Sequence, residues 1–287
     1  MKLYAISDLH LERPKNREAL NYIPSFIEDG LILAGDICST AAQLEDALLV
    51  LKKKFKQIIW VPGNHELWIT NDKHNSSVDK YNDLVSVCRK MDVATPEDEY
   101  IKWEHEKNNY LIVPMTLLYD YSFRPEHVDD NDVISWAKES GVLCRDEHLF
   151  DTGHHESIKD WCWERIQYTQ ERLTDCDPNI PMILVNHFPL RYDLVRTMRI
   201  PRFSIWCGTK KTEHWHKEYN VDVVVSGHLH MRSTDYRDGV RFEEVSLGYP
   251  NDWRSEEGRG IAPYLREILP GPSKPYHHAG PFWKFRI

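Results

Sequence analysis

The chain has 287 residues, of which 41% are hydrophobic and 28% are charged, a mixture typical of globular proteins. Its formal net charge is −9, which argues against a non-specific nucleic-acid binder because an acidic surface repels polyanions. We interpret the six cysteines as reduced thiols, since none forms a C-x-x-C pair and a core of this size needs no disulfides. The polar Ser7-Asp8 comes too early for a signal peptide, and no apolar run approaches the ~20 residues that span a bilayer. We therefore expect a soluble, cytoplasmic protein.

The first part of the chain alternates predicted strands and helices. Residues 2–6 and 31–34 are apolar without alternation, which is typical of strands buried on both faces. Residues 40–55 predict a helix, because apolar side chains recur there at intervals of three and four. A third strand over 57–61 and a helix over 79–91 follow. This alternation favours an α/β fold in which a parallel sheet carries helices on its faces.

The region 119–178 has a different character. It is acidic, it carries helical patterns over 132–140 and 155–173, and it contains no recognisable motif. We interpret it as a helical insert or cap in a single domain that spans residues 1–287.

Two more buried strands are predicted downstream, over 181–185 and 221–225. From about residue 270 the chain is rich in Pro, Gly and aromatic residues, which predicts a coil tail on the surface.

Each of the five predicted strands is followed by a polar cluster, where a sheet of this kind opens its ligand crevice. The side chains of these clusters that can bind metal ions are Asp8, His10, Asp36, Asn64, His187, His228 and His230. Any one cluster alone is more often a simple turn. Five in the same topological position point instead to one shared metal site, because unrelated polar residues would not recur at every strand end.

The order of these clusters resembles the signature blocks of the calcineurin-like metallophosphoesterase superfamily. The flanking segments 117–123 and 199–203 resemble those of bacterial-type members of unassigned substrate. The blocks are Asp8-x-His10, Gly35-Asp36, Gly63-Asn64-His65-Glu66, Asn186-His187 and Gly227-His228-Leu229-His230. The resemblance implies two packed, mainly mixed β-sheets flanked by helices, the four-layer sandwich of that superfamily.

The resemblance also implies two divalent metal ions. Asp8, His10, Asp36 and His230 would hold one ion; Asp36, Asn64, His187 and His228 would hold the other. Asp36 would bridge the pair. Mixed nitrogen and oxygen ligands suit Mn, Fe, Zn or Co better than Ca or Mg.

His65 would stay off the metals and face the substrate, either as a general acid or as an electrostatic stabiliser of the phosphoryl oxygens. Glu66 would either orient a neighbouring side chain or sit on the surface. The protein-phosphatase branch has a carboxylate and an arginine where this chain has Ser39 and Thr40, and it has a further arginine soon after its Asn-His-Glu block. Their absence argues against a phosphoprotein phosphatase.

A basic segment follows His187 and offers candidates for holding the substrate. Arg191, Arg199 and Arg202 are the residues we consider, because guanidinium groups suit phosphate oxygens. A solvated basic loop is the alternative.

These features predict a metal-dependent hydrolase that cleaves a phosphomonoester or phosphodiester by attack of a metal-activated water. The expected partner is a small phosphorylated substrate or a nucleotide. The alternatives are a nuclease or nucleotide pyrophosphatase on the same scaffold, and a non-catalytic protein-binding module that retains the fold.

Overall fold

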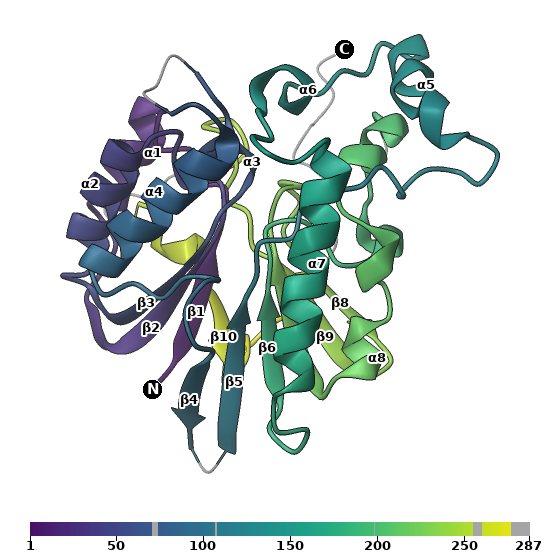
Figure 1. The fold of residues 1–287 in the computed structure, drawn as a ribbon. Coiled ribbons are helices and arrows are strands. Elements are labelled where there is room, and N and C mark those ends of the chain that lie inside the picture. The colour runs from purple at the N-terminus through teal and green to yellow at the C-terminus, as the bar shows by residue number, and fades with distance from the viewer. Residues whose placement is uncertain (71–73, 107, 198, 255–259, 277–287) are drawn as a thin grey trace.

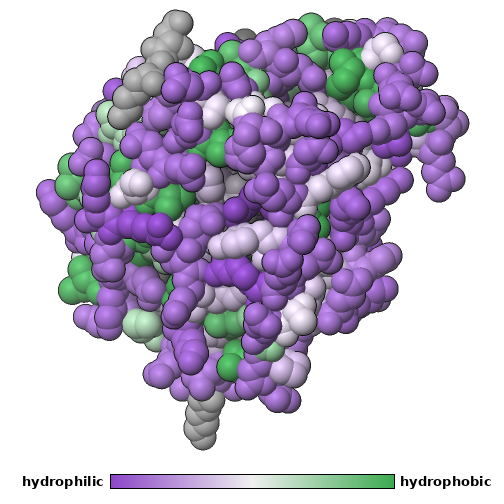
Figure 2. Space-filling model, in the orientation of Figure 1, coloured by the Kyte–Doolittle hydropathy of each residue, from purple (hydrophilic) through white to green (hydrophobic). Residues whose placement is uncertain are grey.

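The computed structural model describes residues 1–70, 74–106, 108–197, 199–254 and 260–276. Two β-sheets pack face to face, and helices cover their outer faces, so the molecule has four layers (Figure 1). The face seen in Figure 2 is largely hydrophilic, with apolar residues in small scattered groups. Two mixed sheets flanked by helices is the architecture that the family resemblance implied, and that prediction is confirmed.

The first sheet has four strands in the order β10-β1-β2-β3. Its strands are β1 (Leu3–Ile6), β2 (Phe26–Ala34), β3 (Phe55–Val61) and β10 (Arg266–Leu269). The first three run parallel, and β10 pairs antiparallel with β1. Three helices cover the outer face: α1 (Pro14–Leu20), α2 (Ala41–Leu51) and α4 (Ser77–Lys90) (Figure 1).

The second sheet has six strands in the order β4-β5-β6-β7-β9-β8. They are β4 (Ile101–His105), β5 (Asn108–Pro114), β6 (Met182–Val185), β7 (Val221–Ser226), β8 (Ser233–Arg237) and β9 (Val240–Glu244). The four inner strands run parallel, and β4 and β8 pair antiparallel at the two edges. Outside this sheet lie α7 (Ile158–Thr174) and α8 (Trp215–Glu218).

Between the sheets lies a core of aliphatic side chains with Trp103 among them. Gly30 of β2 faces this indole, and a Cβ atom on Gly30 would lie 2.2 Å from the nearest ring carbon. The two sheets can pack together at this point because Gly30 has no side chain where Trp103 places its indole ring.

The region 119–178 contains the 3₁₀ turn η1 (Asp130–Asp132), α5 (Val133–Glu139), α6 (Asp146–Leu149) and the longer α7. The helix predicted from residue 155 begins only at Ile158, because the Ser157 side chain caps it by accepting a hydrogen bond from the Asp160 N–H. In Figure 1, α5 and α6 stand over the end of the sheets where the parallel strands finish. Their interpretation as an insert or cap remains a prediction.

The remaining short helices are α3 (Asn64–Leu67), η2 (Tyr192–Leu194), η3 (Pro201–Trp206), η4 (Lys210–Thr212) and η5 (Ala262–Tyr264). All six cysteines are free thiols. None of the helices in the described ranges combines the length and apolar content that crossing a membrane requires. The coil predicted from residue 270 has no helix or strand over 270–276, and the rest of it lies outside the described residues.

Candidate metal centre

The five polar clusters meet at one rim of the molecule. Three of them follow β1, β2 and β3 of the first sheet, and two follow β6 and β7 of the second. Backbone hydrogen bonds hold the loops together: the Asp8 N–H donates to the Gly35 carbonyl (2.9 Å), and the Gly227 N–H donates to the His187 carbonyl (2.8 Å). The centre therefore spans both sheets, which the strand pattern alone did not reveal.

Two groups of side chains lie within reach of a common ion. Asp8, His10 and His230 form the first, with His230 Nε2 at 3.0 Å from an Asp8 carboxylate oxygen and 3.2 Å from His10 Nε2. Asp8, Asp36 and His187 form the second, with His187 Nε2 at 3.5 Å from Asp36 Oδ2. Asp8 belongs to both groups, and Asp36 forms a further group with His10 and His65, so buried carboxylates lie at the centre of the arrangement.

Several buried ligand atoms of this rim have no hydrogen-bond partner among the described residues: Asn64 Oδ1, His187 Nε2 and His228 Nε2. A buried polar atom left unpaired is costly, whereas a metal ion would satisfy all three. His187 Nδ1 lies 2.9 Å from the Ala34 carbonyl, which can only accept, so Nδ1 carries a proton and Nε2 is the atom that would bind a metal ion. The donor set fits a borderline transition-metal ion.

The pKa values of the histidines at this rim reflect burial and the neighbouring carboxylates. Burial lowers the pKa of His187, but the adjacent Asp36 carboxylate more than offsets this and raises it to about 10. For His228 burial prevails, and its pKa falls to about 3. Without a metal ion, His187 carries a positive charge between these carboxylates. A bound cation would supply that positive charge instead.

The backbone at this rim is strained. Asp8, His10, Asp36, His228 and His230 all adopt positive φ angles, between 44° and 72°. This left-handed conformation costs non-glycine residues roughly 1 kcal/mol each, so it persists only where the surrounding structure imposes it. Crowding explains the neighbouring glycine in one loop: a Cβ atom on Gly63 would lie 2.2 Å from Asp36 Oδ1.

Glu66 is fully buried, so the surface alternative is wrong. Its carboxylate accepts hydrogen bonds from the backbone N–H groups of Gly63, Asp36, Ile37 and Cys38, at 2.6 to 3.2 Å. Burial, together with the negative charge of Asp36, raises the pKa of Glu66 to about 7. Glu66 thus fixes the loop that presents Asp36 rather than the ring of His65.

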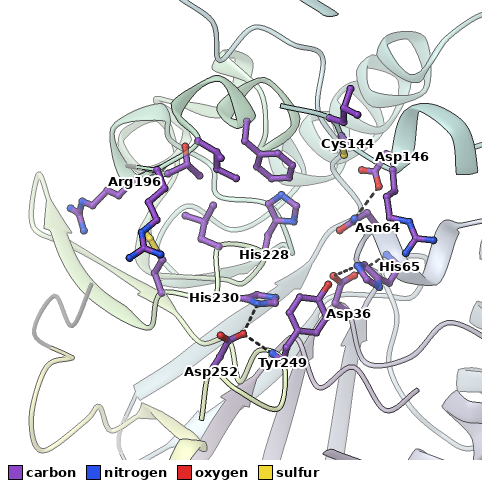
Figure 3. A pocket seen from close by; sticks show the side chains of 18 of the residues that line it. Asp36, Asn64, His65, Cys144, Asp146, Arg196, His228, His230, Tyr249 and Asp252 are labelled. Carbon is purple, nitrogen blue, oxygen red and sulfur yellow. Dashed lines mark hydrogen bonds and ion pairs between the residues drawn. The ribbon is translucent and has the colours of Figure 1, made fainter. Parts of the chain in front are cut away.

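His65 lies in the same cluster. Its Nε2 is 3.8 Å from Asp36 Oδ2 (Figure 3). Its ring packs on Trp68, with the ring centroids 3.7 Å apart. Burial lowers the pKa of His65 below its ordinary value. Its ring is therefore held between the metal ligands and an indole, facing the pocket described next.

Three residues that sequence reasoning missed hold the ligands in place. Asp252 lies 3.3 Å from His230 Nδ1, and Asp146 accepts a hydrogen bond from Asn64 Nδ2 at 3.0 Å (Figure 3). Tyr249 stacks on His10, with ring centroids 4.4 Å apart. Tyr249 and Asp252 follow β9, so a search for polar clusters behind every strand would have found them; nothing in the sequence marks Asp146.

A pocket of about 560 Å³ opens beside the cluster (Figure 3). Asp36, Asn64, His65, His228 and His230 line one side, and apolar residues line another: Leu143, Ile200, Phe203, Leu229 and Met231. Its position beside the candidate ligands makes it the candidate space for a substrate.

Of the three arginines considered for the substrate, Arg199 lines this pocket. Arg191 and Arg202 do not: Arg191 Nε donates to Asp193 (2.8 Å), and Arg202 Nη1 donates to Glu139 (3.0 Å). Both guanidinium groups are thus bound to carboxylates outside the pocket.

Comparison with known proteins decides the family. The model of the calcineurin-like phosphoesterase family matches residues 1–232. This chain belongs to that family. It is accordingly a metallophosphoesterase, a hydrolase of phosphoric esters, and the family implies divalent metal ions.

One relative is similar over almost the whole chain. The [acyl-carrier-protein] phosphodiesterase PptH of Mycobacterium tuberculosis is 43% identical over 276 residues, which cover 94% of this chain and 84% of that protein. The crystal structure of the phosphopantetheinyl hydrolase PptH from the same organism superposes with a TM-score of 0.87 at 41% identity, covering 95% of this chain and 97% of that one. A putative 5′-nucleotidase from Staphylococcus aureus matches at 12% identity with a TM-score of 0.41, over 85% of this chain and 48% of its own.

Proposed function

We propose that this protein is a phosphodiesterase that uses two divalent metal ions. Asp8, His10, Asp36 and His230 would hold one ion, and Asp36, Asn64, His187 and His228 the other. The observation that carries this proposal is the meeting of these side chains at one rim, with unpaired ligand atoms of Asn64, His187 and His228 buried beside the shared carboxylates. Bound ions would neutralise the phosphoryl oxygens and lower the pKa of the attacking water.

The protein's own residues would orient the substrate. His65 lines the pocket and is held against Trp68, so its ring can donate a hydrogen bond to a phosphoryl oxygen or a proton to the leaving oxygen. In the overall step, the water oxygen bonds to phosphorus, the ester P–O bond breaks, and the departing oxygen takes up a proton.

We favour a diester over a monoester, because a diester places organic groups on both sides of the phosphorus. The apolar wall formed by Leu143, Ile200, Phe203 and Met231 can pack against such a group while the phosphate faces the polar side.

The substrate class follows from the similarity to PptH. We propose a carrier protein to which a phosphopantetheinyl group is joined by a phosphodiester bond. Identity of 43% over 94% of this chain supports the assignment, because the matched length includes the region 119–178 that contributes Leu143 to the apolar wall.

The test is to incubate the purified protein and Mn²⁺ with a phosphopantetheinylated carrier protein, and to follow both products by mass spectrometry. We expect the carrier protein to return to its unmodified mass while phosphopantetheine appears in solution. Chelation of the metal and the Asp36→Ala variant should both abolish the reaction, since Asp36 is the proposed bridging ligand.

Parallel assays with bis(4-nitrophenyl) phosphate, a dinucleotide pyrophosphate and single-stranded DNA address the alternatives. Turnover of the generic diester with an unchanged carrier protein would contradict the proposed substrate but not the proposed phosphodiesterase activity. Turnover of only the pyrophosphate or the DNA would favour the nucleotide pyrophosphatase or the nuclease.

A further inference from the structure

Three arginines that lie outside the strand-end motifs line the pocket: Arg145, Arg196 and Arg199. Arg196 binds both carboxylate oxygens of Asp235 (3.0 and 2.6 Å), and Arg199 is also engaged.

Arg145 differs from them. Within the described part of the chain, its guanidinium group makes no hydrogen bond and no ion pair, although it lines the pocket together with Asn64 and His65. Its central carbon lies over the Trp68 ring, 5.2 Å from the ring centroid. The positive charge of Arg145 therefore lies at the pocket, and no carboxylate of the described residues neutralises it.

Asp146, the residue after Arg145, fixes this part of the chain to the metal rim. Asp146 is almost completely buried, and its Oδ1 accepts hydrogen bonds from Trp68 Nε1 (2.6 Å) and Asn64 Nδ2 (3.0 Å). Trp68 in turn packs on His65. The same indole thus touches the guanidinium of Arg145, the carboxylate of Asp146 and the ring of His65, and it ties α6 to the metal rim.

We infer that Arg145 binds the phosphoryl group of the substrate beside Asn64 and His65, with Trp68 and Asp146 as its positioning residues. The inference rests on the proposed function and adds a substrate-binding residue to it. A guanidinium offers two parallel N–H donors that match two phosphate oxygens. As negative charge grows on those oxygens during attack, a fixed donor pair stabilises it without having to reorient.

The test uses Arg145→Gln, a change at an exposed position, in the Mn²⁺-loaded protein. Isothermal titration with inorganic phosphate should show a dissociation constant raised roughly 10- to 100-fold, the loss expected for a hydrogen bond to a charged group. The kcat/KM for bis(4-nitrophenyl) phosphate should fall by a similar factor, while the bound metal per chain stays the same. Arg145→Lys should recover part of the affinity, because it keeps the charge but loses the paired donors.

Arg89→Gln is the matched control, since Arg89 is an exposed arginine of α4 that pairs with Asp98 and does not line the pocket. It should bind phosphate as the parent does. Phosphate affinity of Arg145→Gln within twofold of the parent, or loss of metal from that variant, would overturn the inference. Because phosphate binding is measured directly, an inactive carrier-protein assay would count against the proposed substrate and leave this result standing.

Discussion

Carboxylate side chains that are not themselves proposed metal ligands fix the orientation of the proposed ligands. Asp146 accepts from Asn64 Nδ2, which turns the amide so that Oδ1 is left unpaired toward the rim. Burial raises the pKa of Asp146 to about 6, although the hydrogen bonds from Trp68 and Asn64 act in the opposite direction. Without such a partner an asparagine amide is free to rotate and to present its NH₂ group to the metal instead.

Replacing Asp146 should therefore weaken metal binding without removing a ligand. We expect Asp146→Ala to lower Mn²⁺ affinity by about 10- to 100-fold, the usual effect of losing a group that orients a ligand. Competition with a fluorescent chelator measures it, with far-UV circular dichroism to verify folding. Glu139→Gln removes an exposed carboxylate of α5 and serves as the control. Equal affinities in the parent and Asp146→Ala would show that the amide needs no anchor.

The sequence indicated candidate metal ligands but not the residues that hold them, for a physical reason. A ligand such as Asp36 follows a buried strand, and both strand and turn are local features. Asp146 comes from a helix with no motif and meets Asn64 across 82 residues of chain, so only the folded structure brings them together. Arg191 and Arg202 show the converse. Both were candidates for holding the substrate, but in the folded structure each donates a hydrogen bond to a carboxylate outside the pocket.

At the scale of elements, the fit between the two sheets depends on β2 and β4. Gly30 leaves room for the indole of Trp103, which is fully buried between the sheets. The φ angle of Gly30 is not positive, so the requirement for glycine here is steric rather than conformational.

A methyl group at this position should force the sheets apart. We expect Gly30→Ala to lower the free energy of unfolding by about 1–3 kcal/mol, as overpacking does. In the Trp103→Phe background the same change should cost less, because phenylalanine lacks the ring atoms that the methyl group would meet. Urea unfolding of the four proteins measures the coupling, and strictly additive effects would refute this account of the sheet contact.

Element prediction succeeded for the uniformly apolar runs, but it missed the edge strands and also the inner strands β5 and β9. The apolar runs over 31–34 and 57–61 lie in β2 and β3. The edge strands β4 and β8 carry alternating or polar residues and gave no comparable pattern. The helix predicted over 40–55 ends at Leu51, because Phe55 already pairs with Phe26 in the first sheet.

At the scale of the whole molecule, the fold places the ends of two sheets at one rim. The first sheet contributes Asp8, His10, Asp36 and Asn64, and the second contributes His187, His228 and His230. Neither sheet alone holds a full ligand set, so metal binding should depend on the packing between them. The overall negative charge does not oppose an anionic substrate at this point, because bound cations reverse the local field.

The metal content of the purified protein tests the central claim most directly. After loading with Mn²⁺ and removal of unbound metal, elemental analysis should find two ions per chain in the parent and in His65→Ala, and fewer in Asp36→Ala and His228→Ala. A folded parent protein that retains no metal, or a content equal in all four proteins, would contradict the account.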